Sequence, residues 1–202
     1  MKKPATKLDA KQLRVSKPSS QEISKIKRRE IYIICDNILD TYNIGSIFRL
    51  ADAVVAKKIY LCGQTETPPN SRISKASVGT DKWVPWQYIA SAQGAIEYLK
   101  KKFSTRSNNK HAHLRGVLRS DMAHLGGEVR LKVIAIEQSP KSIDYRSVKF
   151  QEPVAFVIGH ETSGVSKEAL ALCDQIVEIP MFGVNRSLNV MVSLAIVLYK
   201  SL

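Results

Sequence analysis

The sequence has few cysteines, and none of them forms a recognisable disulfide or metal motif. Of its 202 residues only Cys35, Cys62 and Cys173 are cysteine, and no CxxC spacing occurs. A small, odd-numbered and scattered set predicts reduced thiols in the cytoplasm rather than a disulfide framework. A catalytic cysteine stays open at this point, although buried structural thiols are the common case.

The sequence also lacks a long apolar run. No segment approaches the roughly 18 apolar residues of a membrane-spanning helix, so we expect no membrane association. Residues 1–17 are basic and lack the apolar core of a secretory signal. Hydrophobic residues nevertheless make up 44% of the chain. A chain of this length and composition predicts one domain with a sizeable core.

The usual nucleotide-binding fingerprints are missing. No GxGxxG occurs, and the segment GHETSGVS (Gly159–Ser166) has Val165 where a phosphate-binding loop requires lysine. This excludes the common dinucleotide folds and nucleoside triphosphate hydrolysis. Gly159 and Gly164 still allow either a close approach to a ligand or a plain strand-to-helix turn.

A metal site is not indicated either. His111, His113 and His124 lie in a basic segment without accompanying cysteines or an acidic cluster, so we expect no metal. His160 in the glycine loop is either an acid–base group or a surface histidine.

Positive charge is abundant and unevenly distributed. The net charge is +13; residues 1–30 hold ten Lys and Arg against three Asp and Glu, and residues 100–132 hold nine against two. The remainder is close to neutral. Two basic clusters on a neutral body favour a nucleic-acid partner, the alternative being a solubilising tail and a solvated loop.

Apolar segments alternate between strand and helix character along the chain. This order predicts an α/β domain with a parallel sheet over residues 30–202, preceded by a basic arm over residues 1–29 that has a short helix near its end. The expected strands are Glu30–Cys35, Lys58–Cys62, Leu131–Glu137, Val154–Ile158 and Gln175–Ile179. The expected main helices are Asn43–Val55, Ser91–Lys102, Lys167–Leu172 and Ser187–Ser201, the first of them capped by Asn43.

The loop Pro180–Asn189 (PMFGVNRSLN) is dense in uncharged polar side chains. Ser187 is either the cap of the last helix or a ligand-binding residue. Asn189 falls in the first turn of an otherwise apolar helix, where a buried amide needs partners. Because ligands bind beyond the carboxyl ends of parallel strands, we expect this loop and the glycine loop to form one site.

Three segments together resemble the SpoU/TrmH family of RNA ribose 2′-O-methyltransferases, within the SPOUT superfamily. They are NIGSIFRLADA (Asn43–Ala53), FVIGHETSGVS (Phe156–Ser166) and IPMFGVNRSLNVMVSLAIVLY (Ile179–Tyr199), in the order of the family's three motifs. TPPN and KASVG, within Thr67–Gly79, are similar to a further family segment.

The resemblance implies a parallel sheet of five or six strands with a C-terminal trefoil knot, S-adenosylmethionine as cofactor, RNA as partner and a homodimer. The implied cofactor-binding residues are Gly159, Gly164, Ile179, Met181, Ser187 and Leu188. The implied catalytic residues are Asn43, Arg49, Glu161, Ser187 and Asn189. Whether Arg49 acts as the formal base stays open, because a guanidinium remains protonated.

Two departures from the family pattern stand out. His160 follows the motif glycine where relatives often have asparagine, and residues 103–131 look like a basic insertion that binds RNA. The short arm favours tRNA over rRNA as substrate. A non-catalytic RNA-binding or ribosome-assembly factor on the same fold, and methylation of a base rather than a ribose, remain alternatives.

Overall fold

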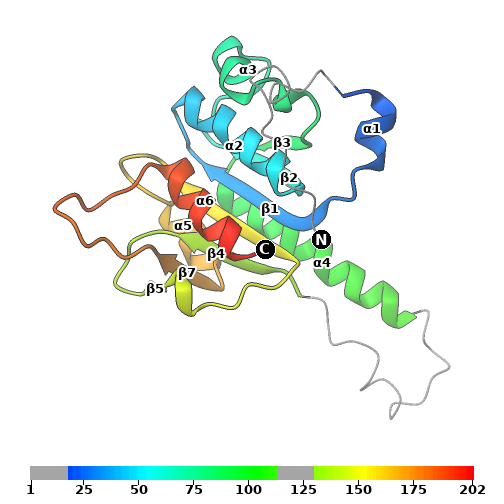
Figure 1. Cartoon of the computed structure of the whole chain (residues 1–202). Coiled ribbons are helices and arrows are strands. Elements are labelled where there is room, and N and C mark those ends of the chain that lie inside the picture. Colours follow the sequence, from blue (N-terminus) through cyan, green and yellow to red (C-terminus); the bar gives the residue numbers. More distant parts are fainter. Residues whose placement is uncertain (1–17, 113–129) are drawn as a thin grey trace, which may run out of the picture.

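A seven-stranded parallel sheet forms the centre of the protein (Figure 1). We describe a computed structural model that covers residues 18–112 and 130–202, without the side chains of residues 106–112. The strand order is β3-β2-β1-β6-β4-β7-β5, and every neighbouring pair is parallel. The strands are β1 (Arg29–Asp36), β2 (Ala56–Cys62), β3 (Trp86–Ile89), β4 (Lys132–Ile136), β5 (Ile143–Asp144), β6 (Val154–Gly159) and β7 (Gln175–Glu178).

Helices cover both faces of the sheet, so the predicted α/β class is confirmed. On one face lie α2 (Thr41–Ala53) and α6 (Val190–Lys200), with α3 (Ser71–Ser77) packed against α2. On the other lie α4 (Ala92–Ala112) and α5 (Lys167–Leu172). The short α1 (Ser20–Lys25) precedes β1, with residues 1–17 of the predicted arm outside the described part. Single turns of 3₁₀ helix occupy Thr80–Lys82 and Tyr145–Ser147.

The sheet core explains why the central strands were predictable. β1 and β6 are adjacent, and their alternate side chains enter different apolar layers. Ile33 and Phe156 pack with α2 and α6, whereas Tyr32 and Ala155 pack on the α4 side. A strand buried on both faces reads as a continuous apolar run.

The predicted number of strands was too low, because the sequence patterns of the two edge strands do not indicate strands. β3 has the sequence WQYI and no fully buried residue, and β5 has only two residues. Edge strands need no continuous apolar pattern, since only part of their surface is covered. The segment Gly63–Tyr88, which reads as one long loop, also contains α3.

Several helix boundaries differ from the expected ones. Asp40, not Asn43, caps α2, because its carboxylate accepts from the main-chain N–H of Tyr42; Asn43 lies inside the first turn and is only 6% exposed. Asn189, not Ser187, caps α6. α4 continues to Ala112, into the predicted insertion, whose remaining residues up to 129 lie outside the description. The trefoil knot stays a prediction.

Within residues 18–112 and 130–202, no helix is long and apolar enough to cross a membrane.

Candidate functional site

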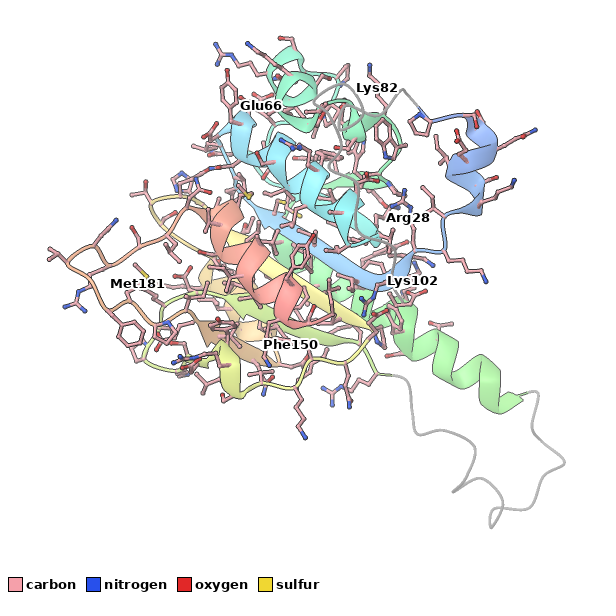
Figure 2. The ribbon with its side chains drawn as sticks, in the orientation of Figure 1. Arg28, Glu66, Lys82, Lys102, Phe150 and Met181 are labelled. Carbon is pink, nitrogen blue, oxygen red and sulfur yellow. The ribbon has the colours of Figure 1, made fainter. Side chains whose placement is uncertain are left out.

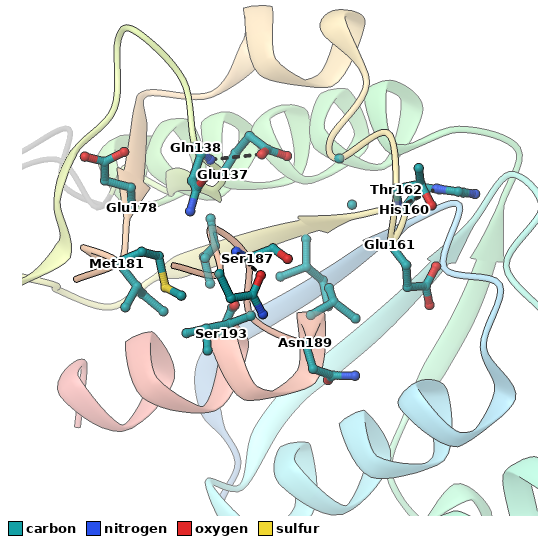
Figure 3. A pocket seen from close by; sticks show the side chains of 18 residues that line it. Glu137, Gln138, His160, Glu161, Thr162, Glu178, Met181, Ser187, Asn189 and Ser193 are labelled. Carbon is teal, nitrogen blue, oxygen red and sulfur yellow. Dashed lines mark hydrogen bonds between the residues drawn. The ribbon is translucent and has the colours of Figure 1, made fainter. Parts of the chain in front are cut away.

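A cavity of about 460 Å³ lies at the carboxyl ends of β4, β6 and β7 (Figure 3). Its wall is completed by the loop that leads from β7 into α6. All the residues predicted to bind cofactor line it: Gly159, Gly164, Ile179, Met181, Ser187 and Leu188. Of the predicted catalytic residues, Glu161, Ser187 and Asn189 line it too.

The glycine loop after β6 folds back tightly on itself. The main-chain N–H of His160 donates to the Gly164 carbonyl at 3.1 Å, and the Gly164 N–H donates to the His160 carbonyl at 2.9 Å. A Cβ added at Gly159 would come within 2.1 Å of the Gly164 carbonyl carbon, so no larger residue fits there. Gly164 has φ +71°, a left-handed conformation that favours glycine.

His160 organises this loop through its ring. Its Nδ1 accepts hydrogen bonds from the main-chain N–H groups of Thr162 at 3.0 Å and Ser163 at 3.2 Å. The side-chain oxygen of an asparagine accepts from main-chain N–H groups two residues on in the same way. The departure at position 160 left the hydrogen bonding of this loop open, and Nδ1 of the imidazole supplies the acceptor.

Two carboxylates hold the far end of the loop, and sequence reasoning missed both. Asp36, 2% exposed at the end of β1, accepts from the Ser166 N–H at 2.8 Å. Glu137, just after β4, accepts from the Val165 N–H at 2.8 Å. The available signal was an acidic residue at the carboxyl end of each of two apolar strands.

A chain of side-chain hydrogen bonds links the three predicted motifs. The Asn189 amide donates to Asn43 Oδ1 at 2.9 Å, and Asn43 Nδ2 donates to Glu161 Oε1 at 3.1 Å. Glu161 also accepts from the main-chain N–H groups of Leu39 at 3.2 Å and Asp40 at 3.1 Å. Asn189 and Glu161 lie at the end of the cavity opposite Met181 and Glu178 (Figure 3). We call Asn189, Asn43 and Glu161 the amide–carboxylate chain.

These contacts keep Glu161 ionised. Burial alone would raise its pKa. This effect is outweighed by hydrogen bonds from the Asn43 amide and from three main-chain N–H groups, those of Glu161 itself, Asp40 and Leu39. The pKa of Glu161 is therefore lowered from its ordinary value of 4.5. A carboxylate with a lowered pKa is a weak base and a strong anchor.

The last residues of the loop before α6 are fixed at two points. Asn189 Oδ1 accepts from the Met191 and Val192 N–H groups, so this residue caps α6 while its Nδ2 reaches Asn43. At the other side, Gln138 Nε2 donates to the Arg186 carbonyl at 2.7 Å, which ties the loop to the end of β4. Ser187 lies between these two anchors and faces the cavity.

Arg49 is the one predicted catalytic residue outside this cluster. It is exposed on α2 and is not among the cavity-lining residues of the described chain. Six helical positions separate it from Asn43, which amounts to about 9 Å along the axis and a different side of the helix. The structure therefore does not bring Arg49 to the cavity.

The remaining candidates from the sequence lie elsewhere. Burial raises the pKa of the Cys62 and Cys173 thiols to about 12, and that of Cys35 well above its ordinary value, so none supplies a thiolate near neutral pH. None of the three lines the cavity. No group of three potential metal ligands occurs among residues 18–112 and 130–202, and His111, His113 and His124 lie outside the described side chains.

Comparison with known proteins places this cavity in context. The chain is 26% identical over 178 residues to the tRNA (guanosine(18)-2′-O)-methyltransferase of Escherichia coli K12, a match that covers 87% of this chain and 64% of that protein. It is 26% identical over 181 residues to the enzyme of the same name from Thermus thermophilus, covering 90% and 78%. The chain thus spans just under two thirds of its E. coli relative.

A solved structure shares the fold. The SpoU methyltransferase AviRb from Streptomyces viridochromogenes, in complex with the cofactor AdoMet, superposes with a TM-score of 0.66 at 23% identity, covering 88% of this chain and 62% of that one. The family model described as the SpoU rRNA Methylase family matches residues 30–130 and 112–199, which together are most of the chain. The chain belongs to the SpoU rRNA Methylase family.

Proposed function

We propose that this protein transfers a methyl group from S-adenosylmethionine to a ribose 2′-hydroxyl in structured RNA, with tRNA favoured over rRNA. The observation that carries the proposal is the amide–carboxylate chain, which joins the three motif segments at one end of the cavity. The relatives named for 2′-O-methylation of tRNA support the substrate class.

The cavity fits S-adenosylmethionine in size and chemistry. Its volume of about 460 Å³ lies in the usual range for small-molecule sites. Ile136, Ile179 and Leu188 offer apolar surface for an adenine ring, and the main chain of Gly159 forms part of the cavity wall. Lining carboxylates, among them Glu178, suit a positively charged sulfonium and ammonium. When bound, the cofactor supplies an electrophilic methyl group.

The chain's own residues position the acceptor. Methyl transfer needs an aligned, dry approach, so orientation contributes much of the rate. We propose that Ser187 and Asn189 orient the ribose. Asn43 and Glu161 fix the position of the glycine loop relative to the loop before α6. Arg49 is exposed on α2 and lies outside the cavity wall, so we assign its guanidinium to a phosphate of the bound RNA, from which its positive charge favours the oxyanion of the target hydroxyl.

The first test is methylation mapping. Total tRNA and rRNA from cells lacking this protein should gain 2′-O-methyl groups on incubation with the protein and methyl-labelled cofactor. The modified nucleotide should resist alkaline cleavage, because a blocked 2′-hydroxyl cannot attack its phosphate; label on an alkali-sensitive nucleotide would indicate base methylation instead. Arg49→Ala should abolish labelling with the fold intact, whereas the exposed-site control Lys82→Ala should not.

A non-catalytic RNA-binding or ribosome-assembly factor is the second candidate. Such a factor needs no cofactor cavity, whereas a cavity that suits S-adenosylmethionine lies beside the amide–carboxylate chain in this protein. Calorimetry separates the two: an enzyme binds S-adenosylmethionine, whereas absence of binding at millimolar cofactor favours the assembly factor.

We also propose a homodimer. Phe182 is 88% exposed and Val184 is 99% exposed, two residues apart in the loop beside the cavity. Large apolar side chains grouped this way mark an interaction surface. Light scattering should give a dimer mass, and Val184→Asp should shift it to monomer. Val78→Asp, at an exposed valine near α3, is the matched control.

RNA is the partner that the charge distribution supports. The family match begins at residue 30, which fits a basic arm over residues 1–29 and a methyltransferase domain over residues 30–202. We place the protein in the cytoplasm. The predicted RNA-binding insertion lies largely outside the described residues. Replacing its basic residues together should weaken RNA binding and flatten the salt dependence; unchanged affinity and slope would remove the insertion from the interface. The residues to replace are Arg106, Lys110, Arg115 and Arg119.

A further inference from the structure

A second cavity, of about 550 Å³, lies between the start of α2 and the start of α3. Leu39, Asp40 and Tyr42 form one wall, and Glu66, Asn70 and Arg72 the other. Figure 2 shows Glu66 close to the start of α2, below α3. None of these residues lines the first cavity.

The two cavities are neighbours across a single loop. The main-chain N–H groups of Leu39 and Asp40, which belong to the second cavity, donate to the Glu161 carboxylate, which lines the first. Tyr42 directly precedes Asn43, the central member of the amide–carboxylate chain. A ligand that fills the first cavity up to Glu161 therefore lies next to the second.

The walls of the second cavity are held before any ligand arrives. Buried Thr65 accepts from the Ile38 N–H at 2.9 Å and donates to the Cys35 carbonyl, which fastens the segment carrying Glu66 to the loop carrying Tyr42. Asn70 caps α3 by accepting from the Arg72 N–H at 2.9 Å.

Three functional groups on these walls are free to bind. Tyr42 is 53% exposed, and Glu66 and Arg72 lie at the surface. Within the described part of the chain, the side chains of these three residues form no hydrogen bond or ion pair with the protein. An aromatic ring, a guanidinium plane and a carboxylate acceptor are the groups that take up an unstacked RNA base: the planes stack on it, and the carboxylate accepts from its N–H donors.

We propose that this second cavity binds a nucleobase of the substrate RNA, at or beside the methylated ribose, by stacking on Tyr42 and by hydrogen bonding to Glu66. Guanine fits best, because its ring N–H and amino group are adjacent donors for one carboxylate, while Arg72 offers donors to its acceptor edge. The inference rests on the proposed function only for the choice of RNA as ligand.

The test uses binding of short RNAs, which does not depend on methyl transfer. Fluorescein-labelled pentamers UUGUU and UUUUU are titrated with the full chain, and the guanine-containing pentamer should bind more tightly. Tyr42→Ala should weaken UUGUU binding about 5- to 150-fold, the range for one stacked base, whereas Tyr42→Phe should bind like wild type. Glu66→Ala, which removes the acceptor altogether, should remove the preference for UUGUU over UUUUU.

Calorimetric affinity for S-adenosylmethionine should be unchanged in all three variants, since none of the residues lines the first cavity. Wild-type affinity of Tyr42→Ala for UUGUU would overturn the proposal. The proposal would also be overturned if Tyr42→Ala changed the oligomeric mass of the protein without loss of RNA affinity, because the second cavity would then be a subunit contact. If the pentamer results hold but no RNA is methylated, the base site stands and the proposed reaction fails.

Discussion

Replacing Asn43 with alanine tests the amide–carboxylate chain most directly. Asn43 is 6% exposed and makes two side-chain hydrogen bonds, one to the ionised Glu161 and one from the Asn189 amide. A neutral bond contributes about 0.5–1.5 kcal/mol and one to a charged group about 1.5–3 kcal/mol. Because Glu161 is exposed, we take the lower end for its bond and expect Asn43→Ala to lower the free energy of unfolding by about 2–3 kcal/mol.

The assay is urea unfolding at neutral pH, compared with Ser46→Ala one turn further along α2. That control removes one half-buried hydroxyl that forms no hydrogen bond within the described residues, so it should stay within about 0.5 kcal/mol of wild type. RNA methylation is measured on the same samples below the unfolding transition, and only Asn43→Ala should lose it. A loss of stability under about 0.5 kcal/mol together with full activity would show that the amide–carboxylate chain neither supports the fold nor positions the motifs.

Three further predictions concern the same loops. His160→Asn should retain cofactor affinity, because its side-chain oxygen can accept from Thr162 and Ser163, whereas His160→Ala should lose it in calorimetry; equal affinities would refute the role of the ring. Gly159→Ala should abolish cofactor binding while circular dichroism stays native, since the added Cβ meets Gly164 at 2.1 Å; wild-type binding would contradict this geometry. The folded-state pKa of Glu161 is lowered, so its carboxylate stabilises the fold above pH 4.5 and this contribution disappears as the pH falls through the folded-state value. The stability gap between wild type and Glu161→Gln should therefore shrink in acid titrations of urea midpoints, and a constant gap would exclude the linkage.

The location of the site follows from the sequence, whereas the hydrogen bonds between its side chains do not. Apolar runs that end in GHETSGVS and PMFGVNRSLN predict a ligand site at the carboxyl edge of a parallel sheet, and the cavity lies there. The hydrogen bond from Asn189 to Asn43 joins residues 146 positions apart. No local pattern encodes such a pairing, because it depends on how α2 and α6 pack on the same face of the sheet.

The misplaced caps have a related cause. Local propensity favours Asn43 as a cap and leaves Ser187 as either a cap or a ligand-binding residue, because both have the side chains of capping residues. In the structure Asp40 and Asn189 take those positions, and this frees Asn43 to turn inward from the first helical turn. Tertiary hydrogen bonds, which local sequence does not report, decided which of several competent residues became the cap.

The carboxylates around the first cavity already act as hydrogen-bond acceptors, which bears on how the ribose loses its proton. Asp36 and Glu137 accept from the glycine loop, and Glu178 accepts from the Ser142 hydroxyl at 2.8 Å. Glu161 accepts from Asn43 and from the main-chain N–H groups of Leu39 and Asp40, besides its own. A general base contributes about 10²- to 10⁴-fold to a rate and works best with a pKa near the operating pH. Glu161, with its lowered pKa, is poorly suited to that role.

Glu161→Gln separates the two possible roles of this carboxylate. Glutamine keeps an acceptor oxygen for the main-chain N–H groups of Leu39 and Asp40 but takes up no proton. If Glu161 positions the motif loops, kcat for RNA methylation should fall less than about tenfold, and Glu161→Ala should cost more than Glu161→Gln because it removes the acceptor altogether. A loss of about 100-fold or more in Glu161→Gln, with cofactor and RNA affinity retained, would identify Glu161 as the base and displace the electrostatic role assigned to Arg49.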